Sequence, residues 1–419
     1  MNYYVPASAD SAEEAILSAW DTQIKSAADT PWLERLLAER GSELFTVFAQ
    51  RYDELRVLPR SARRVLQRSL ARSPDSATVP PEWRRKLAYS LAGAALLLAL
   101  GLGSVQASTI TVSAKTAPEI NNGDGKCSFF EAIRNANDTV NGMVHIDCAA
   151  GNPAGADTIV LPKGTQTLTR AYNTAYGTTG VLLITSEITI QGNNTKIIRK
   201  KGSPQFRLFT VAATGDLTLN GVTLSGGNGG QGGAIRSDGI LVVNESTISG
   251  NSSSQGGAII NLGDYLGINN CIITRNTATY GGAIGSYAGA TVIIDQSTIS
   301  KNSAATSGGG IRSSSYIRIT DSIITGNHAG THSGGIYNSI GGGTLVIDNS
   351  TISKNSAGSG GGVLNNRSFT ITNSVITGNT ATSRGGGVYN GGDYLLFSST
   401  GNIITKNKAP LGPDVYMAP

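Results

Sequence analysis

One hexapeptide recurs along the chain at an almost constant interval. STISGN begins at Ser246, STISKN begins at Ser297 and again at Ser350, and close relatives lie between them. When the copies are aligned, the same isoleucine returns at steps of 24 to 28 residues. The aligned positions are Ile248, Ile273, Ile299, Ile324, Ile352, Ile376 and Ile404. An internal repeat of this length is typical of solenoids, propellers and repeat arrays.

Three further features recur at the same interval. An Asn follows each isoleucine by three residues, at Asn251, Asn276, Asn302, Asn327, Asn355, Asn379 and Asn407. A Gly-Gly-(Ala/Gly)-Ile motif ends at Ile235, Ile259, Ile284 and Ile311, with relatives ending at Ile336, Val363 and Val388. Alternating apolar pairs precede the hexapeptide, at Leu217/Leu219, Leu241/Val243, Leu266/Ile268, Val292/Ile294, Ile317/Ile319, Leu345/Ile347 and Phe369/Ile371. Each unit therefore offers three short extended stretches separated by turn residues.

These units are too short for a propeller blade, which needs four strands in about 40 residues. Three strands and three turns fit one coil of a parallel β-helix. We therefore predict an all-β fold, with a right-handed parallel β-helix of about ten coils over residues 161–409 and a C-terminal tail over 410–419. Like residues then stack on like, so the isoleucines form an internal file. We expect the asparagines to form a hydrogen-bonded ladder at a bend, in left-handed backbone.

The chain before the repeat has a different character. Residues 1–83 are rich in charge, contain all three Trp and show helical spacing, which predicts a helical cytoplasmic region. In segment 84–107, a basic RRK precedes the uncharged run 87–105. The run is long enough for a transmembrane anchor. It also fits a signal peptide cleaved between Ala107 and Ser108. Both readings export everything that follows.

Residues 108–160 are expected to cap the open end of the solenoid, because stacked repeats need a terminal cover. SFFEAIRNA within this segment has amphipathic spacing and predicts a short capping helix. Cys127 and Cys148 flank that helix, and outside the cytoplasm such a pair is expected to form a disulfide. Cys271 takes the serine position of the hexapeptide, so we expect it to be a small residue within a stack.

The cap and the repeat resemble known bacterial sequences. DGKCSFFEAIRNAN followed by HIDCAAGNPAGADTIVLP resembles the CSLREA segment of surface proteins. The GGAI and TITNSxITGN units are similar to repeats of polymorphic outer-membrane proteins. The resemblance covers about residues 112–416. It implies a secreted, outer-membrane or otherwise surface-exposed β-helix that is associated with adhesion.

Candidate catalytic residues are sparse. The acidic residues are spread about one per coil, and Glu245 and Asp321 share a turn position with Asn270, Gln296, Asn349 and Asn373. This pattern favours a solvated ladder over the clustered carboxylates of a hydrolase. The best place for a lyase or hydrolase is Arg312 and Arg318 near Asp321. His328 and His332 are four residues apart, but in a turn they need not converge on a metal. Ser339–Gly343 lengthens one bend and is a candidate binding loop.

One regular outer surface remains. If the isoleucines point inward, their neighbours point outward. These are Thr247/Ser249, Ile272/Thr274, Thr298/Ser300, Ile323/Thr325, Thr351/Ser353, Val375/Thr377 and Ile403/Thr405. The stripe fits a binding face, and equally the ordinary preference of strands for β-branched residues.

We expect a non-enzymatic protein with an adhesin-like binding role or a structural role, without metal or cofactor. The expected partner is a glycan or a surface protein, and residues 87–105 would contact the membrane if uncleaved. Nucleic acid is not expected, because no basic stripe with interleaved aromatics follows residue 110. The alternative is a polysaccharide lyase or glycoside hydrolase.

Overall fold

The computed structural model describes residues 108–114, 120, 123–137, 145–152, 156–287, 289–341, 343–391 and 399–418. The predicted helical region 1–83 and the predicted signal or anchor segment 84–107 lie outside the described residues. No described helix is both long enough and apolar enough to span a bilayer. The solenoid belongs to a compact unit that is separate from residues 1–107.

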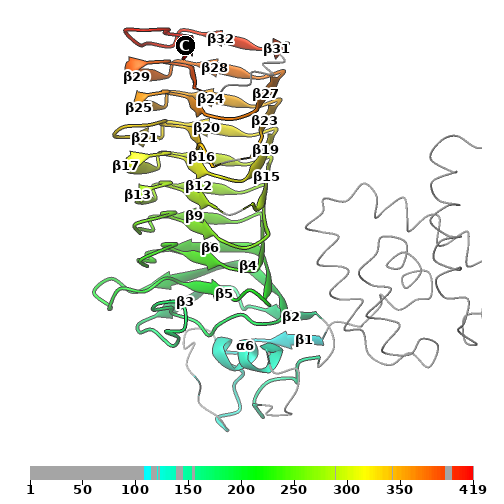
Figure 1. The fold of residues 1–419 in the computed structure, drawn as a ribbon. Helices are drawn as coiled ribbons and strands as arrows, with labels where there is room; N and C mark the ends of the chain where they lie inside the picture. Colours follow the sequence, from blue (N-terminus) through cyan, green and yellow to red (C-terminus); the bar gives the residue numbers. More distant parts are fainter. Residues whose placement is uncertain are drawn as a thin grey trace, which may run out of the picture. The chain divides into compact units, whose positions relative to one another are not determined.

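The described chain forms a parallel β-solenoid of about eight turns with one short helix, which confirms the predicted β-helix architecture (Figure 1). The number of turns is smaller than the ten that we predicted. β4 and β6 each continue from the first face into the second as one long strand, with an irregularity in their register between Gln191 and Thr195. The N-terminal strands are β1 (Ser108–Thr111), β2 (Asp157–Val160), β3 (Thr165–Leu168), β4 (Glu187–Arg199) and β6 (Asp216–Ser225).

Each coil has three faces. The first face holds the alternating apolar pairs, on β8 (Ile240–Asn244), β11 (Tyr265–Asn269), β15 (Thr291–Asp295), β19 (Tyr316–Thr320), β23 (Leu345–Asp348), β27 (Phe369–Thr372) and β31 (Ser399–Thr400). The second face holds the hexapeptides, on β9 (Thr247–Ser249), β12 (Ile272–Thr274), β16 (Thr298–Ser300), β20 (Ile323–Thr325), β24 (Thr351–Ser353), β28 (Val375–Thr377) and β32 (Ile403–Thr405). Both faces join one 19-stranded sheet through β4 and β6.

The third face is a separate nine-stranded sheet that follows the Gly-Gly motifs. Its strands are β5 (Phe209–Val211), β7 (Ile235–Ser237), β10 (Ile259–Asn261), β14 (Ile284–Ser286), β18 (Ile311–Ser313), β22 (Ile336–Asn338), β26 (Val363–Asn365), β30 (Val388–Asn390) and β33 (Val415–Met417). The strand β33 pairs with β30, so the solenoid extends through residues that we predicted to be a tail beginning at 410.

A fourth, short series of strands was not predicted. It consists of β13 (Thr277–Tyr280), β17 (Ser303–Ser307), β21 (His328–Ala329), β25 (Ser356–Ser359) and β29 (Thr380–Arg384). Its inward residues are small, and Ala304, Ala329 and Ala357 form a cluster of their own. Without large apolar residues, the segment has no hydrophobic alternation that would indicate a strand.

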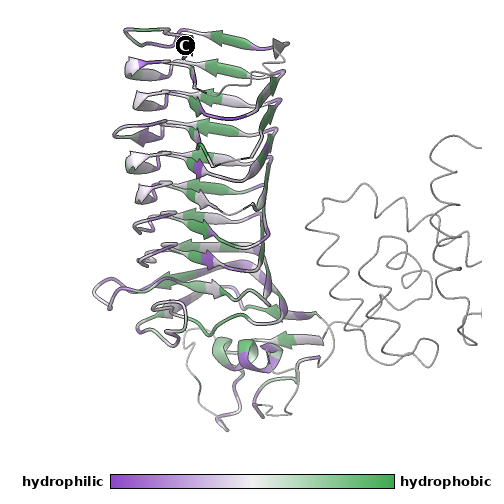
Figure 2. Cartoon of the chain, viewed as in Figure 1, coloured by the Kyte–Doolittle hydropathy of each residue, from purple (hydrophilic) through white to green (hydrophobic). Residues whose placement is uncertain are grey.

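The isoleucine file is present as predicted. Ile273 pairs with Ile248 on one side and with Ile299 on the other, and the register continues through Ile324, Ile352, Ile376 and Ile404. All are fully buried except Ile404, which lies in the last coil. Figure 2 shows hydrophobic residues concentrated in the stacked strands and hydrophilic ones in the turns. Burial of each isoleucine contributes about 1.5–3 kcal/mol.

The asparagines form a continuous buried ladder. In the central coil, the backbone N and the Nδ2 of Asn302 both donate to Oδ1 of Asn327, at 2.9 and 3.0 Å. The Nδ2 of Asn302 also donates to the carbonyl of Ile273, at 3.0 Å. The same pattern links Asn251, Asn276, Asn302, Asn327, Asn355, Asn379 and Asn407. At the C-terminal end Asp414 replaces the next asparagine, and its Oδ1 accepts from N and Nδ2 of Asn407.

The expected left-handed backbone lies one residue earlier than we predicted. The residue before the ladder asparagine has positive φ, for example Arg275 at 56°, Lys301 at 55° and Gly326 at 64°. The bend therefore occurs ahead of the asparagine. The asparagine itself can then direct its side chain inward along the stack, where it meets its neighbours.

Two more ladders run parallel to the first. In the serine ladder, Oγ of Ser297 accepts from N of Cys271 at 3.0 Å and donates to the carbonyl of Asp295 at 2.7 Å. The thiol of Cys271 accepts in the same way from N of Ser246, and burial raises the pKa of Cys271 to about 11. The thiol is therefore a protonated ladder member. A third ladder joins Asn338, Asn365 and Asn390 at the end of the third face.

The first coil is covered by helix α6 (Phe129–Asn137), as we predicted (Figure 1). Ser128 and Glu131 form a reciprocal capping box at its start. Phe129 and Phe130 are fully buried, and the Phe129 ring lies 6.3 Å from that of Phe209. The predicted cap, residues 108–160, also contains β1 and β2, which already pair with the solenoid sheet.

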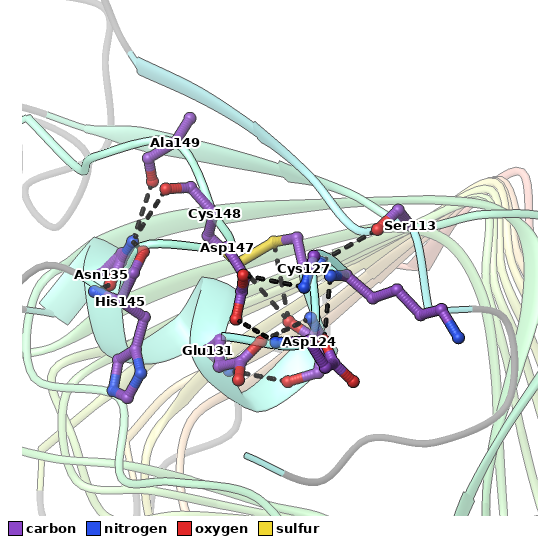
Figure 3. Close-up of a disulfide and its surroundings, with 12 residues drawn as sticks. Ser113, Asp124, Cys127, Glu131, Asn135, His145, Asp147, Cys148 and Ala149 are labelled. Carbon is purple, nitrogen blue, oxygen red and sulfur yellow. Dashed lines mark hydrogen bonds between the residues drawn. A yellow bond between two sulfur atoms is a disulfide. The ribbon is translucent and has the colours of Figure 1, made fainter. Parts of the chain in front are cut away.

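A disulfide joins Cys127 to Cys148 beside α6, with Cα atoms 4.6 Å apart (Figure 3). Two polar contacts hold the same loops. The Asp147 carboxylate accepts from the backbone N of Gly125 at 3.0 Å, and Asn135 Oδ1 accepts from N of His145 at 2.8 Å. The disulfide and these polar contacts thus hold the loops of the cap together, and the Phe129–Phe209 contact joins the cap to the solenoid.

Asp157, in β2, gives this region a pH dependence. It is fully buried, one oxygen accepts from N of Asn152 at 2.8 Å, and the other has no hydrogen-bond partner. Burial raises its pKa from 3.8 to about 7. Because the folded state holds the proton more tightly, this residue favours folding below about pH 4 and loses that contribution as pH rises toward 7.

We expect Asp157→Asn to remove this dependence, since the amide keeps the acceptor without charge. The free energy of unfolding, measured by denaturant titration from pH 4 to pH 8, should fall less steeply in the variant. Each pKa unit of the shift corresponds to about 1.4 kcal/mol. Identical slopes for the two proteins would show that Asp157 ionises freely in the folded state.

Candidate functional site

Two columns of outward side chains meet at a corner between the fourth series and the third face. The residue five positions before the middle of each third-face strand faces that middle residue. Gln231 thus accepts from Arg236 Nη1 at 2.6 Å, and the His332 ring stacks on Tyr337 at 5.8 Å. The facing pairs are Gln231/Arg236, Gln255/Ile260, Tyr280/Gly285, Ser307/Arg312, His332/Tyr337, Ser359/Leu364, Arg384/Tyr389 and Leu411/Tyr416.

The paired glycines create this corner. Gly308 has a φ of 68°, and a Cβ there would lie 2.5 Å from the carbonyl oxygen of Ile311. Glycine accommodates the left-handed backbone and the close approach most easily, although Ser333 occupies the equivalent position in the next coil at a φ of 46°. The Gly-Gly motif therefore recurs because it turns the chain back on itself once per coil.

Arginines and tyrosines gather in the corner. The Arg312 guanidinium lies 4.5 Å from the Tyr280 ring centroid, 5.6 Å from Tyr287 and 6.0 Å from Tyr337. Three coils farther along, Arg384 lies 5.5 Å from the Tyr416 ring, which stacks on Tyr389 at 5.2 Å. We call these residues the aromatic corner, and they are Tyr280, Tyr287, Arg312, His332, Tyr337, Arg384, Tyr389 and Tyr416.

The aromatic corner carries positive charge without a matching carboxylate. Neither of its two columns contains Asp or Glu. Arg236, nearer the N-terminus, is neutralised by Asp238 at 2.7 Å, whereas neither Arg312 nor Arg384 forms an ion pair with any residue that the structure describes. Arg312 Nε and the Tyr287 hydroxyl are buried and have no hydrogen-bond partner in the described part of the chain. Burial raises the pKa of Tyr287, and the adjacent Arg312 charge opposes that rise.

The outward stripe of the second face is also where we predicted it. Ile272, Ile323 and Ile403 are 49%, 46% and 55% exposed, and the threonines of the same column are half-buried. Hydroxyls along the stripe bond to one another, as Ser300 does to Thr274 at 3.2 Å. The stripe is therefore a regular but chemically mixed surface.

The structure does not bring the suggested catalytic residues together. Arg312 lies on the third face in the aromatic corner. Arg318 points outward from the first face between Ile293 and Val346. Asp321 lies at the turn after β19 and accepts from Nδ2 of Asn349. Asp321 and Asn349 share positive φ with Glu245, Asn270, Gln296 and Asn373, so this turn position is used for bending.

The remaining candidates lie apart. His328 and His332 are both exposed, and they have different partners, since His328 Nδ1 bonds Ser356 Oγ at 3.0 Å while His332 stacks on Tyr337. Among the described residues, no group of three or more His, Cys, Asp or Glu is placed to hold a metal. In the loop Ser339–Gly343, Ile340 is exposed and its carbonyl accepts from Arg367.

We did not predict a role for the tyrosines of the aromatic corner from the sequence. Their signal is positional, because Arg or Tyr directly follows the Ile or Val that opens five of the third-face strands, at 236, 312, 337, 389 and 416. No protein family, no curated protein and no solved structure matches this chain. The resemblance to CSLREA and polymorphic outer-membrane proteins stays a prediction.

Proposed function

We propose that this chain is an exported, surface-displayed β-helix that acts as an adhesin-like binding rod, wound in the right-handed sense expected for parallel crossovers. The observation that carries the proposal is the regularity of its outer faces. The second-face stripe continues in one register from β9 to β32, so it offers the same side-chain positions to an extended partner coil after coil.

Two features support export and a binding role without catalysis. The cap contains a disulfide, a bond that persists in oxidising compartments and is rare in the cytoplasm. The buried asparagines and serines of the hexapeptides are engaged in ladders that hold the coils together. The carboxylate suggested for catalysis, Asp321, is separated from Arg312 by its position at another turn.

The test combines location with binding. The full chain, expressed in its own host, should be found outside the cytoplasm, and its N-terminal residue should be Ser108 if the leader is cleaved. The purified chain should bind host or target cells, or glycans on an array, in a saturable manner. Absence of all binding, together with turnover of a polysaccharide, would contradict the proposal and favour the enzymatic alternative.

A further inference from the structure

We propose that the aromatic corner is the ligand-binding site of this rod and that it takes a linear acidic glycan lying along the solenoid axis. This inference rests on the proposed binding function and adds a place and a ligand class to it. The site is distinct from the second-face stripe, because it lies on the nine-stranded sheet and the short fourth series.

Charge is the first argument. Arg312 and Arg384 present guanidinium groups that have no carboxylate partner among the described residues, and the two columns of the corner contain no acidic residue. Arg236 on the same face is neutralised within the protein. Its Nε and Nη2 donate hydrogen bonds to the Asp238 carboxylate at 2.7 and 2.9 Å. A guanidinium fork fits the planar carboxylate of a sugar acid, or a sulfate, in the same way.

The tyrosines supply the second argument. Tyr280, Tyr337, Tyr389 and Tyr416 are half-buried, so each shows part of a ring at the surface. A half-exposed tyrosine combines an apolar ring with a polar hydroxyl. That combination suits a sugar, which has apolar C–H faces and a rim of hydroxyls. A flexible acidic peptide would use the arginines but has no comparable need for the rings.

Repetition along the axis is the third argument. Tyr280 on the fourth series contacts Arg312, which lies on the third face one coil later. Arg384 on the fourth series contacts Tyr416 on the third face in the same way, so the positions of arginine and tyrosine are exchanged. His332 and Tyr337 lie between these two contacts. These two arginine–tyrosine pairs lie in one line along the axis. Such an arrangement suits a polymer with a short chemical repeat, because different units of one chain can bind the two pairs.

The experiment measures binding of the full chain to polygalacturonate, heparin, neutral dextran and poly-L-glutamate by titration calorimetry at fixed salt. Two single variants are compared. Arg312→Gln removes charge inside the aromatic corner, and Arg318→Gln removes the same charge from an exposed position on the first face. Both side chains point outward, so unchanged thermal unfolding should verify that each variant is folded.

We expect wild type to bind at least one of the two acidic glycans and not dextran, with polygalacturonate reporting carboxylate and heparin reporting sulfate recognition. Arg312→Gln should weaken binding by about tenfold or more, the effect of losing a charge-assisted hydrogen bond. Arg318→Gln should change it less than about threefold, because salt screens an exposed charge that lies away from the ligand. Equal losses in the two variants would overturn the site.

Two other results would overturn the ligand class. Binding of poly-L-glutamate as tightly as the acidic glycans would show that charge alone is recognised. Absence of binding to both acidic glycans, while the chain still binds cells or another array component, would refute this inference and leave the binding-rod proposal intact. If cell and array binding are absent as well, the proposed function fails with it.

Discussion

Asn302→Ala should lower the free energy of unfolding by about 3–5 kcal/mol, an unusually large loss for one polar residue. The Asn302 side chain accepts from N and Nδ2 of Asn276 and donates to the Ile273 carbonyl and to Asn327. Alanine leaves the buried backbone N of Asn276 without its acceptor. The amide is shielded from bulk water, because the ladder asparagines are almost completely buried.

The matched control is Thr298→Ala, a residue four positions earlier that points outward from β16 and is half-buried. It should change the free energy of unfolding by less than about 1 kcal/mol, because surface substitutions away from special features have small effects. Both values come from denaturant titration followed by circular dichroism. Similar losses in the two variants would mean that the ladder does not stabilise the stack.

Removal of the cap disulfide should have the next largest effect. The double variant Cys127→Ser/Cys148→Ser opens a loop closed by residues 21 apart in sequence. A closed loop of this length stabilises the folded chain by about 3 kcal/mol in the chain-entropy description. We therefore expect the midpoint of denaturation to fall by the corresponding amount, and reducing agent should produce the same shift in the wild type.

The effect should be specific to the cap. Cys271→Ser is the control, because serine occupies the equivalent ladder position at Ser246 and Ser297 and makes the same hydrogen bonds. That variant should unfold like the wild type and remain sensitive to reducing agent. A wild type whose stability is indifferent to reduction would contradict the role that we assign to the disulfide.

Much of the fold could be predicted because the residues that stack on one another in space are the residues that recur in the sequence. A parallel coil places each residue over its counterpart one repeat earlier, so alignment of Ile248 with Ile273 in sequence is also their pairing in space. The inward direction of the isoleucines then follows from strand alternation. The disulfide and α6 could also be predicted, because the cap contains an amphipathic segment flanked by two cysteines.

The aromatic corner was harder to predict because it does not repeat. Its residues change type from coil to coil, and Tyr280 meets Arg312 only because the glycine turn brings two columns together. The turn position also explains the error over left-handed backbone, since the bend is made by Lys301 and not by Asn302. Asp414 was missed for a related reason, since it serves the ladder from a turn outside the repeated hexapeptide.

Electron–electron distances between spin labels on the second face test the stacking most directly. Labels replace Thr247, Thr298, Thr351 and Ile403 in a Cys271→Ser background, and all four positions lie in one register. With strands about 4.8 Å apart, Thr247–Thr351 and Thr298–Ile403 should both give about 19 Å between backbone positions, and Thr247–Ile403 about 29 Å. Unequal distances for the first two pairs, or a third distance no longer than theirs, would contradict a solenoid in which each repeat is one coil.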